Sequence, residues 1–314
     1  MTGREPYAEL VILPLYVGPP PLTPSGIFTT WHESLLPLLA VVVPSLAYLY
    51  GVGRLRGRGV HWPLGRTVAF LLGSAWLAIA TMSSLAVYDT TLFSMHAVQH
   101  MLLVFLAPIF YAMGAPTTLA LRTLPLAWRR RLLALLHSRY LRVISHPVFS
   151  WPVFIATPFV LYLSPLYSLS LRNGLVHELI HLHLVVIGCL LFWPLVSLDP
   201  VPGRMPHPFR LIIALLILPA HVILGLTIMN ESSPIAEPYF RSIGRTTAQM
   251  LSDQNMAGGI MWGTGDVIGL IFLLAIGFQW MRAEERRAVS EDRRLDRLDA
   301  ANARAADDAG RTLR

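Results

Sequence analysis

The chain has 314 residues, of which 54% are hydrophobic and only 14% are charged, and its mean hydropathy is +0.55. This composition excludes an ordinary soluble domain, in which about a quarter of the residues are charged, and is typical of a protein that crosses a membrane several times. The formal net charge is +7, but the arginines fall between apolar runs rather than along one helix face, which argues against a nucleic-acid partner.

Seven apolar stretches are each long enough to cross a bilayer as a helix. In chain order they are Leu35–Tyr50, Thr67–Val87, His96–Met113, Ser150–Leu166, Leu175–Leu198, Pro208–Asn230 and Asn255–Met281. They predict an all-α polytopic membrane protein with three parts: an N-terminal arm (1–34), a seven-helix transmembrane domain (35–281) and a charged tail (282–314). Residues 125–144, between the third and fourth spans, predict an amphipathic helix on the membrane surface.

The distribution of arginines predicts the direction of the chain. Arginines gather in the loops after the first, third and fifth spans and in the tail, whereas the other loops contain few. Because cytoplasmic loops have the excess of basic residues, we expect an extracytoplasmic N-terminal arm and a cytoplasmic C-terminal tail.

Seven of the eleven histidines fall on the predicted outer side: His32, His96, His100, His177, His181, His183 and His221. The pair His96 and His100 and the pair His177 and His181 each share one face of a helix, since their members are four residues apart. The helical rise places His100 and His181 at a matched depth of about 9 Å, with His221 somewhat deeper. Ionisable side chains inside a membrane mark functional sites. We therefore predict a metal site built from the two pairs and His221.

Methionines at the start of the seventh span add sulfur donors at the same predicted level. Met256 and Met261 are thioethers, which together with imidazole suit copper, whereas zinc takes them rarely. The single cysteine, Cys189, excludes a thiolate cluster or a disulfide framework. A metal in this chain must therefore bind histidine, methionine and carboxylate groups.

Three acidic residues are candidates for groups that support the ligands or form the entrance to the site: Glu178, Asp253 and Asp266. A carboxylate as deep as Asp266 is costly in a membrane, so we expect it to face the bundle interior. Its depth-matched partner is His221, whose tautomer it would fix.

Residues 177–181 spell H-E-x-x-H, the pattern of zinc proteases, in which His177 and His181 would hold zinc and Glu178 would activate water. This alternative leaves His96 and His100 unexplained. Two others stay open: a haem ligated by facing histidines, and a metal-free scaffold whose histidines join helices by hydrogen bonds.

Two stretches resemble a known family. HAVQHMLLVFLAPIFYAMGAP (His96–Pro116) and SDQNMAGGIMW (Ser252–Trp262) are similar to the two signatures of the CtaG family of caa3-type cytochrome c oxidase assembly factors, and the resemblance covers about 35–281. It implies a multi-pass protein of the bacterial cytoplasmic membrane that is not an enzyme. Such a protein would bind copper on the outer side and aid its delivery to haem-copper oxidase subunits, with a copper donor protein as a further partner.

Overall fold

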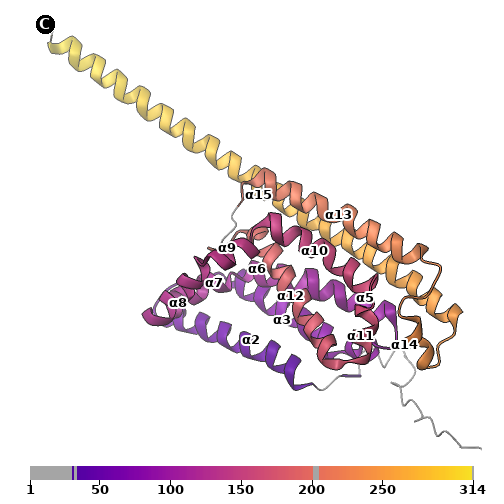
Figure 1. Cartoon of the computed structure of the whole chain (residues 1–314). Helices are drawn as coiled ribbons and strands as arrows, with labels where there is room; N and C mark the ends of the chain where they lie inside the picture. Colours follow the sequence, from indigo (N-terminus) through magenta and orange to yellow (C-terminus); the bar gives the residue numbers. More distant parts are fainter. Residues whose placement is uncertain (1–29, 32–33, 201–204, 313–314) are drawn as a thin grey trace, which may run out of the picture.

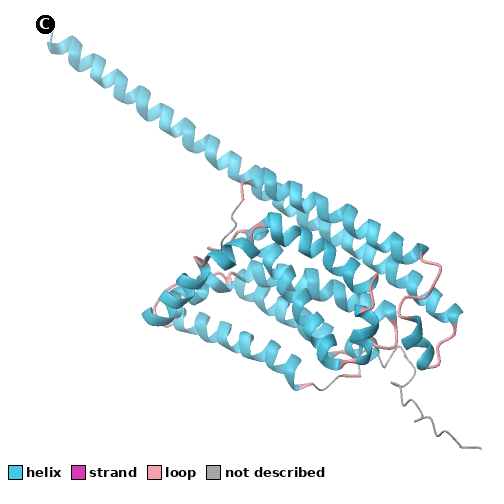
Figure 2. Ribbon diagram, in the orientation of Figure 1, coloured by secondary structure: helices cyan, strands magenta, loops and turns pink. Residues whose placement is uncertain are grey.

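The computed structural model describes residues 30–31, 34–200 and 205–312, and every regular element in these ranges is helical (Figures 1 and 2). His32 and residues 1–29 of the predicted arm lie outside the described residues. In chain order the elements are α2 (Leu35–Arg56), α3 (Leu64–Met82), α4 (Ser84–Tyr88), α5 (Phe93–Met101), the π-helical turn η1 (Leu102–Leu106), α6 (Ala107–Gly114), α7 (Pro116–Thr123), α8 (Leu126–Leu136), α9 (Arg139–Ile144), α10 (Pro147–Tyr162), α11 (Leu166–Arg172), α12 (Gly174–Val196), α13 (His207–Asn230), α14 (Glu237–Ser242) and α15 (Thr247–Thr312).

Six helical segments of the described chain are long and apolar enough to cross a membrane, and α10 with α11 makes a seventh if this bent pair is one span. The predicted all-helical membrane fold is thereby confirmed. The pair bends by 68° between Tyr162 and Leu166, where Pro165 lacks the N–H that would continue the helix. The fourth predicted span is therefore broken in two.

Pro108 interrupts the regular α-helical hydrogen bonds of the third span. Pro108 has no N–H to donate to the carbonyl of Val104, and the backbone widens into η1 at this place. Gly188 of α12 packs directly against that carbonyl and the Pro108 ring, where a Cβ would clash. The contact brings α12 close to the span that begins with α5.

Helices α13 and α15 lie side by side along their length (Figure 1). Gly225 and Gly258 face each other in this contact, because a Cβ on Gly225 would lie only 2.6 Å from the Gly258 carbonyl oxygen. Beyond the bundle α15 continues as one isolated helix to Thr312 (Figure 1).

The bundle has two ends, which we name by their polar residues. At the histidine end, α5, α12 and α15 begin and α14 packs across the bundle; at the arginine end lie α7, α8 and α9 (Figure 1). The predicted amphipathic helix is two helices here, because Ser138 caps α9 by accepting a hydrogen bond from Leu141 N. Which end faces the cytoplasm stays a prediction.

A buried carboxylate joins two helices at the arginine end. Asp199 follows α12, is 0% exposed, and accepts hydrogen bonds from the backbone N–H groups of Thr117 (3.0 Å) and Thr118 (2.8 Å) in the first turn of α7. It also accepts one from Trp193 Nε1 at 2.9 Å. Asp199 thus satisfies a helix N-terminus that would otherwise be unpaired.

Candidate metal centre

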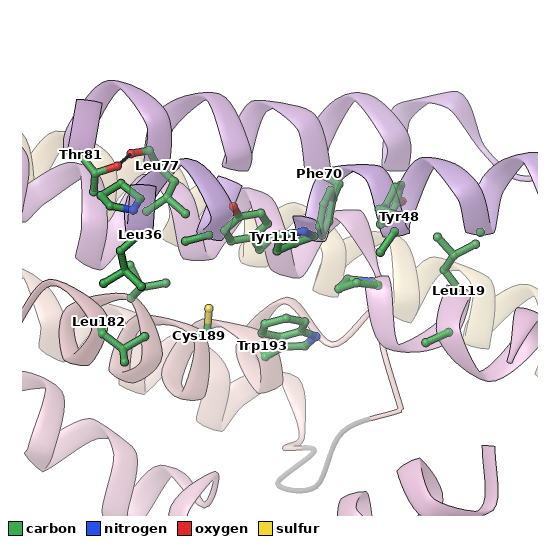
Figure 3. Close-up of a pocket in the computed structure, with 18 of the residues that line it drawn as sticks. Leu36, Tyr48, Phe70, Leu77, Thr81, Tyr111, Leu119, Leu182, Cys189 and Trp193 are labelled. Carbon is green, nitrogen blue, oxygen red and sulfur yellow. Dashed lines mark hydrogen bonds between the residues drawn. The ribbon is translucent and has the colours of Figure 1, made fainter. Parts of the chain in front are cut away.

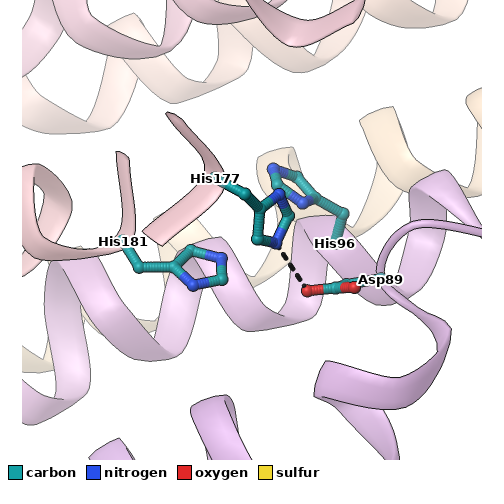
Figure 4. Close-up of side chains that lie close together, drawn as sticks. All are labelled: Asp89, His96, His177 and His181. Carbon is teal, nitrogen blue, oxygen red and sulfur yellow. Dashed lines mark hydrogen bonds and ion pairs between the residues drawn. The ribbon is translucent and has the colours of Figure 1, made fainter. Parts of the chain in front are cut away.

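Four buried side chains converge at the histidine end: Asp89, His96, His177 and His181 (Figure 4). Each offers one ligand atom, and these atoms all lie within 4.8 Å of one another. Their exposed fractions are between 1% and 8%. Asp89 and His96 are near each other in sequence, whereas His177 and His181 come from α12, so the cluster exists only in the folded chain.

The helix ends set the positions of these side chains. His177 and His181 lie one turn apart on α12, with ring centroids 4.3 Å from each other. Asn173 caps α12 by accepting hydrogen bonds from the N–H groups of Leu175 and Val176. His96 lies in the first turns of α5, and its ring centroid is 5.7 Å from that of His177.

Two hydrogen bonds assign the tautomers of the α12 histidines. His177 Nε2 lies 2.9 Å from Asp89 Oδ2, and since a carboxylate accepts, the imidazole donates through Nε2. His181 Nε2 lies 3.1 Å from Gln99 Oε1, while the amide nitrogen of Gln99 donates to the Ala80 carbonyl. In the neutral imidazole the remaining nitrogen of each ring, Nδ1, carries no proton and can bind a metal ion.

The cluster leaves buried nitrogens without partners. Both ring nitrogens of His96, Nδ1 of His177 and Nε2 of His100 have no hydrogen-bond partner among the described residues. Nearby, the ring of Tyr167 packs against His96 and its buried hydroxyl is also unpaired. Buried polar groups are almost always bonded, so these atoms fit a site that receives a ligand.

Two predicted imidazoles lie outside the four-residue group. His100 is buried on α5 and its Nδ1 lies 3.0 Å from the Tyr162 hydroxyl. His221 is buried on α13, where its Nδ1 lies 3.2 Å from the Ile217 carbonyl oxygen and its ring packs on Phe105. The structure therefore brings together three of the five predicted histidines, with a carboxylate in addition.

The three predicted acidic residues have different surroundings. Asp253 caps α5, accepting hydrogen bonds from Phe93 N at 2.7 Å and Ser94 N at 3.2 Å, and it pairs with Arg245 at 3.3 Å. Asp253 thus fixes the N-terminus of the helix that bears His96 and His100.

Glu178 and Asp266 are less tightly held. The Glu178 side chain is 33% exposed and lies 4.0 Å from His181 Nδ1, at the margin of the cluster. Asp266 Oδ1 is buried without a partner, and no hydrogen bond joins it to His221 in the described chain. The predicted pairing of Asp266 with His221 is therefore absent from the hydrogen bonds of these residues.

The two methionines also differ. Met256 is 61% exposed, whereas the cluster is buried, so its sulfur lies on the outside of the bundle. Met261 is fully buried within the hydrophobic core. Neither belongs to the group of converging nitrogen and oxygen atoms.

Sequence reasoning missed Asp89 and Gln99. Asp89 is the acidic residue in the short loop before the third span, seven residues ahead of His96, and this position at the membrane boundary was its only signal. Gln99 is 0% exposed and stands between the two histidines of α5. A fully polar residue inside an apolar helix, beside a histidine pair, was the signal that could have revealed it.

Comparison with known proteins agrees with the resemblance in the sequence. The sequence profile of the family described as cytochrome c oxidase caa3 assembly factor matches residues 46–283. Uncharacterised proteins of Mycobacterium bovis and Mycobacterium tuberculosis are each 34% identical over 289 residues, which is 90% of this chain and 44% of the relative. One of Mycobacterium leprae is 32% identical over 290 residues with the same coverage. The chain thus spans less than half the length of these curated relatives. No solved structure matches it.

Proposed function

The chain belongs to the family of cytochrome c oxidase caa3 assembly factors, and on this premise we propose that it binds copper at the histidine end and aids delivery of the metal to the oxidase. Copper is the cargo in this proposal and His96, His177 and His181 are its ligands. The partners are haem-copper oxidase subunits, a copper donor protein and the lipid of a bacterial cytoplasmic membrane.

The observation that supports this proposal is the set of unpaired nitrogens. Burying a polar atom without a partner costs free energy, and here four imidazole nitrogens are left in that condition. Hydrogen bonds to Asp89 and Gln99 hold two of the rings in the tautomers that a metal needs. Oriented, unprotonated imidazole nitrogens are better suited to binding a metal than to joining helices by hydrogen bonds.

The donor types favour copper that can be released. Imidazole nitrogen with carboxylate oxygen is typical of oxidised copper. The one cysteine of the chain, Cys189, lies two turns beyond His181 and outside the group. Because no thiolate belongs to the cluster, we infer that the site binds copper less tightly than a site with thiolate ligands would.

The partly exposed Glu178 provides a route for exchange. Its side chain is 33% exposed, and its carboxylate lies 4.0 Å from His181 Nδ1 at the margin of the buried cluster. A negative group at that margin would attract a cation toward His181 before the cation enters the site. We assign Glu178 to the entrance, and not to the activation of water as in a zinc protease.

Metal content tests the proposal. We would purify the protein in detergent after growth with copper and measure copper and zinc by mass spectrometry, alongside a His96→Ala/His177→Ala double variant. The matched control is His183→Ala, since His183 lies on α12 but bonds to Thr157 away from the cluster. We expect copper in the parent and in the control, an electron paramagnetic resonance signal of oxidised copper, and no copper in the double variant.

Three results would contradict the proposal. Zinc in place of copper, lost with the double variant, would favour a zinc protease, and Glu178→Gln would then abolish activity while the metal stays bound. No metal in either protein, with normal oxidase assembly by the double variant, would favour a metal-free scaffold. A Soret band in the parent would instead indicate haem.

A further inference from the structure

A long apolar cavity of about 870 Å³ separates α2 from α12. Leu182, Cys189 and Trp193 of α12 face Phe70, Leu77 and Tyr111 of α3 and α6 across it (Figure 3). Helix α2 packs on α3 and α7 and forms the other wall. The cavity therefore lies between membrane spans and not at an aqueous surface.

The two ends of this cavity have different chemistry. At the histidine end its lining includes Glu178 and His181, next to the metal cluster. At the arginine end it includes Tyr50, Arg54 and Thr123. Between these ends the lining is hydrocarbon and aromatic, so an occupant must have a long apolar part.

The cavity follows much of the length of α2. Leu36 and Arg54 both line it, and a separation of 18 residues on α2 gives a length of about 27 Å. This length is enough for an extended acyl chain, and the apolar lining suits one.

The arginine end supplies a positive charge that lacks a counter-charge. Arg54 lines the mouth and donates only to the Tyr50 hydroxyl. Arg58, four residues after Arg54, donates to the backbone carbonyl of Arg122. In the part of the chain that the structure describes, none of these three arginines forms a salt bridge with a carboxylate. Such basic sites between transmembrane helices bind anionic headgroups.

We propose that this cavity binds one anionic phospholipid of the surrounding membrane, with its acyl chains between α2 and α12 and its headgroup phosphate at Arg54. The chains lie along the apolar middle of the cavity and end before Glu178 and His181. The proposal does not depend on the metal, because the headgroup contact at Arg54 is at the opposite end of the cavity from His181.

Native mass spectrometry in detergent tests this proposal, with phosphatidylglycerol as the probe and phosphatidylcholine as the neutral comparison. Ala47→Trp places an indole in the cavity, since Ala47 lines it. Val43→Trp is the matched control, because Val43 is on the same helix, is 56% exposed and does not line the cavity. We expect bound phosphatidylglycerol to fall to background in Ala47→Trp and to persist in Val43→Trp.

The headgroup contact has its own test, which also serves if Ala47→Trp does not fold. Arg54→Gln should reduce the preference for phosphatidylglycerol over phosphatidylcholine about fivefold, the usual effect of one basic residue at a membrane surface. Arg129→Gln, an exposed arginine of α8 that does not line the cavity, should leave the preference unchanged. Equal binding by the two tryptophan variants, an unchanged preference in Arg54→Gln, or retention of a neutral isoprenoid in place of phospholipid would overturn the proposal.

Discussion

Asp199 and the histidine cluster lie at opposite ends of the bundle, and their buried polar groups are satisfied differently. At the arginine end the Asp199 carboxylate accepts from two backbone N–H groups and an indole N–H. At the histidine end four imidazole nitrogens, on His96, His100 and His177, have no partner among the described residues. A buried polar group with all its hydrogen bonds stabilises the fold. A buried polar group without a hydrogen-bond partner lowers the stability of the fold, so its presence calls for a functional explanation.

This difference separates structural from functional burial in a membrane protein. Both regions contain residues that are expensive to place in a bilayer. Their hydrogen bonds tell them apart, because Asp199 and the cluster residues are all buried. The variants below test whether loss of stability follows the bonded groups and loss of metal follows the unbonded ones.

Asp199→Ala should have the largest effect. It leaves the N–H groups of Thr117 and Thr118 and the Trp193 indole without an acceptor, and we expect a loss of about 4 kcal/mol in the free energy of unfolding. Denaturation in detergent measures this loss, and copper per folded chain should be unchanged. Loss of copper at full stability would reverse the roles of the two ends.

His96→Phe should reduce copper affinity and leave stability nearly unchanged. An aromatic ring of similar shape replaces two unpaired nitrogens, so the stability of the metal-free protein should change by less than about 1 kcal/mol. The apparent affinity for copper should fall at least about a hundredfold, which corresponds to about 2.7 kcal/mol of binding free energy. A competition titration with a chelator measures the affinity, with His183→Ala as the unaffected control. A strongly destabilised metal-free variant would show that His96 is a packing residue.

Asp89→Asn should have a smaller effect on the same site. An amide oxygen can still accept the hydrogen bond from His177 Nε2, but it lacks the charge that strengthens this imidazole as a ligand. We expect copper affinity to weaken about tenfold, as for other groups that orient metal-binding histidines. The chelator titration measures this affinity, and an unchanged value would show that Asp89 does not contribute to the metal site.

Asp253→Ala should have a modest effect on both stability and copper affinity. It removes the cap from α5, which costs about 2 kcal/mol of unfolding free energy, and it loosens the helix that bears His96. We expect copper affinity to weaken only a few-fold. Thermal unfolding and the chelator titration on one preparation test the coupling, and a change in one readout without the other would separate the cap from the metal site.

Helical spacing predicted the centre of the site because it is a local property. Histidines four apart share a face, and His96 lies with His177 and His181 in the structure, whereas His100, for which a depth matching that of His181 was predicted, lies outside the group. The sequence could not select among the five histidines, since this depends on how each helix is rotated about its axis. That rotation is set by tertiary contacts such as the approach of Gly188 to the Val104 carbonyl.

The residues that were missed depend on long-range contacts. Asp89 reaches His177 across 88 positions of the chain, and Gln99 reaches His181 across 82. The exposure of Met256 follows from the neighbouring Gly258, which faces Gly225 and turns the opposite side of α15 away from α13. The break after Tyr162 was predictable in kind from Pro165, but its angle of 68° was not.

Helix α15 has an electrostatic consequence of its own. From Arg282 to Thr312 it contains eight arginines and eight acidic residues, while the residues before Arg282 contain 16 arginines and 10 acidic residues. These 31 residues extend the helix by about 46 Å, several times the screening length of about 8 Å in physiological salt. The positive and negative charges of this projecting part of α15 therefore nearly cancel at distances beyond the screening length. Any molecule that recognises it must do so through short-range contact with its interspersed charges.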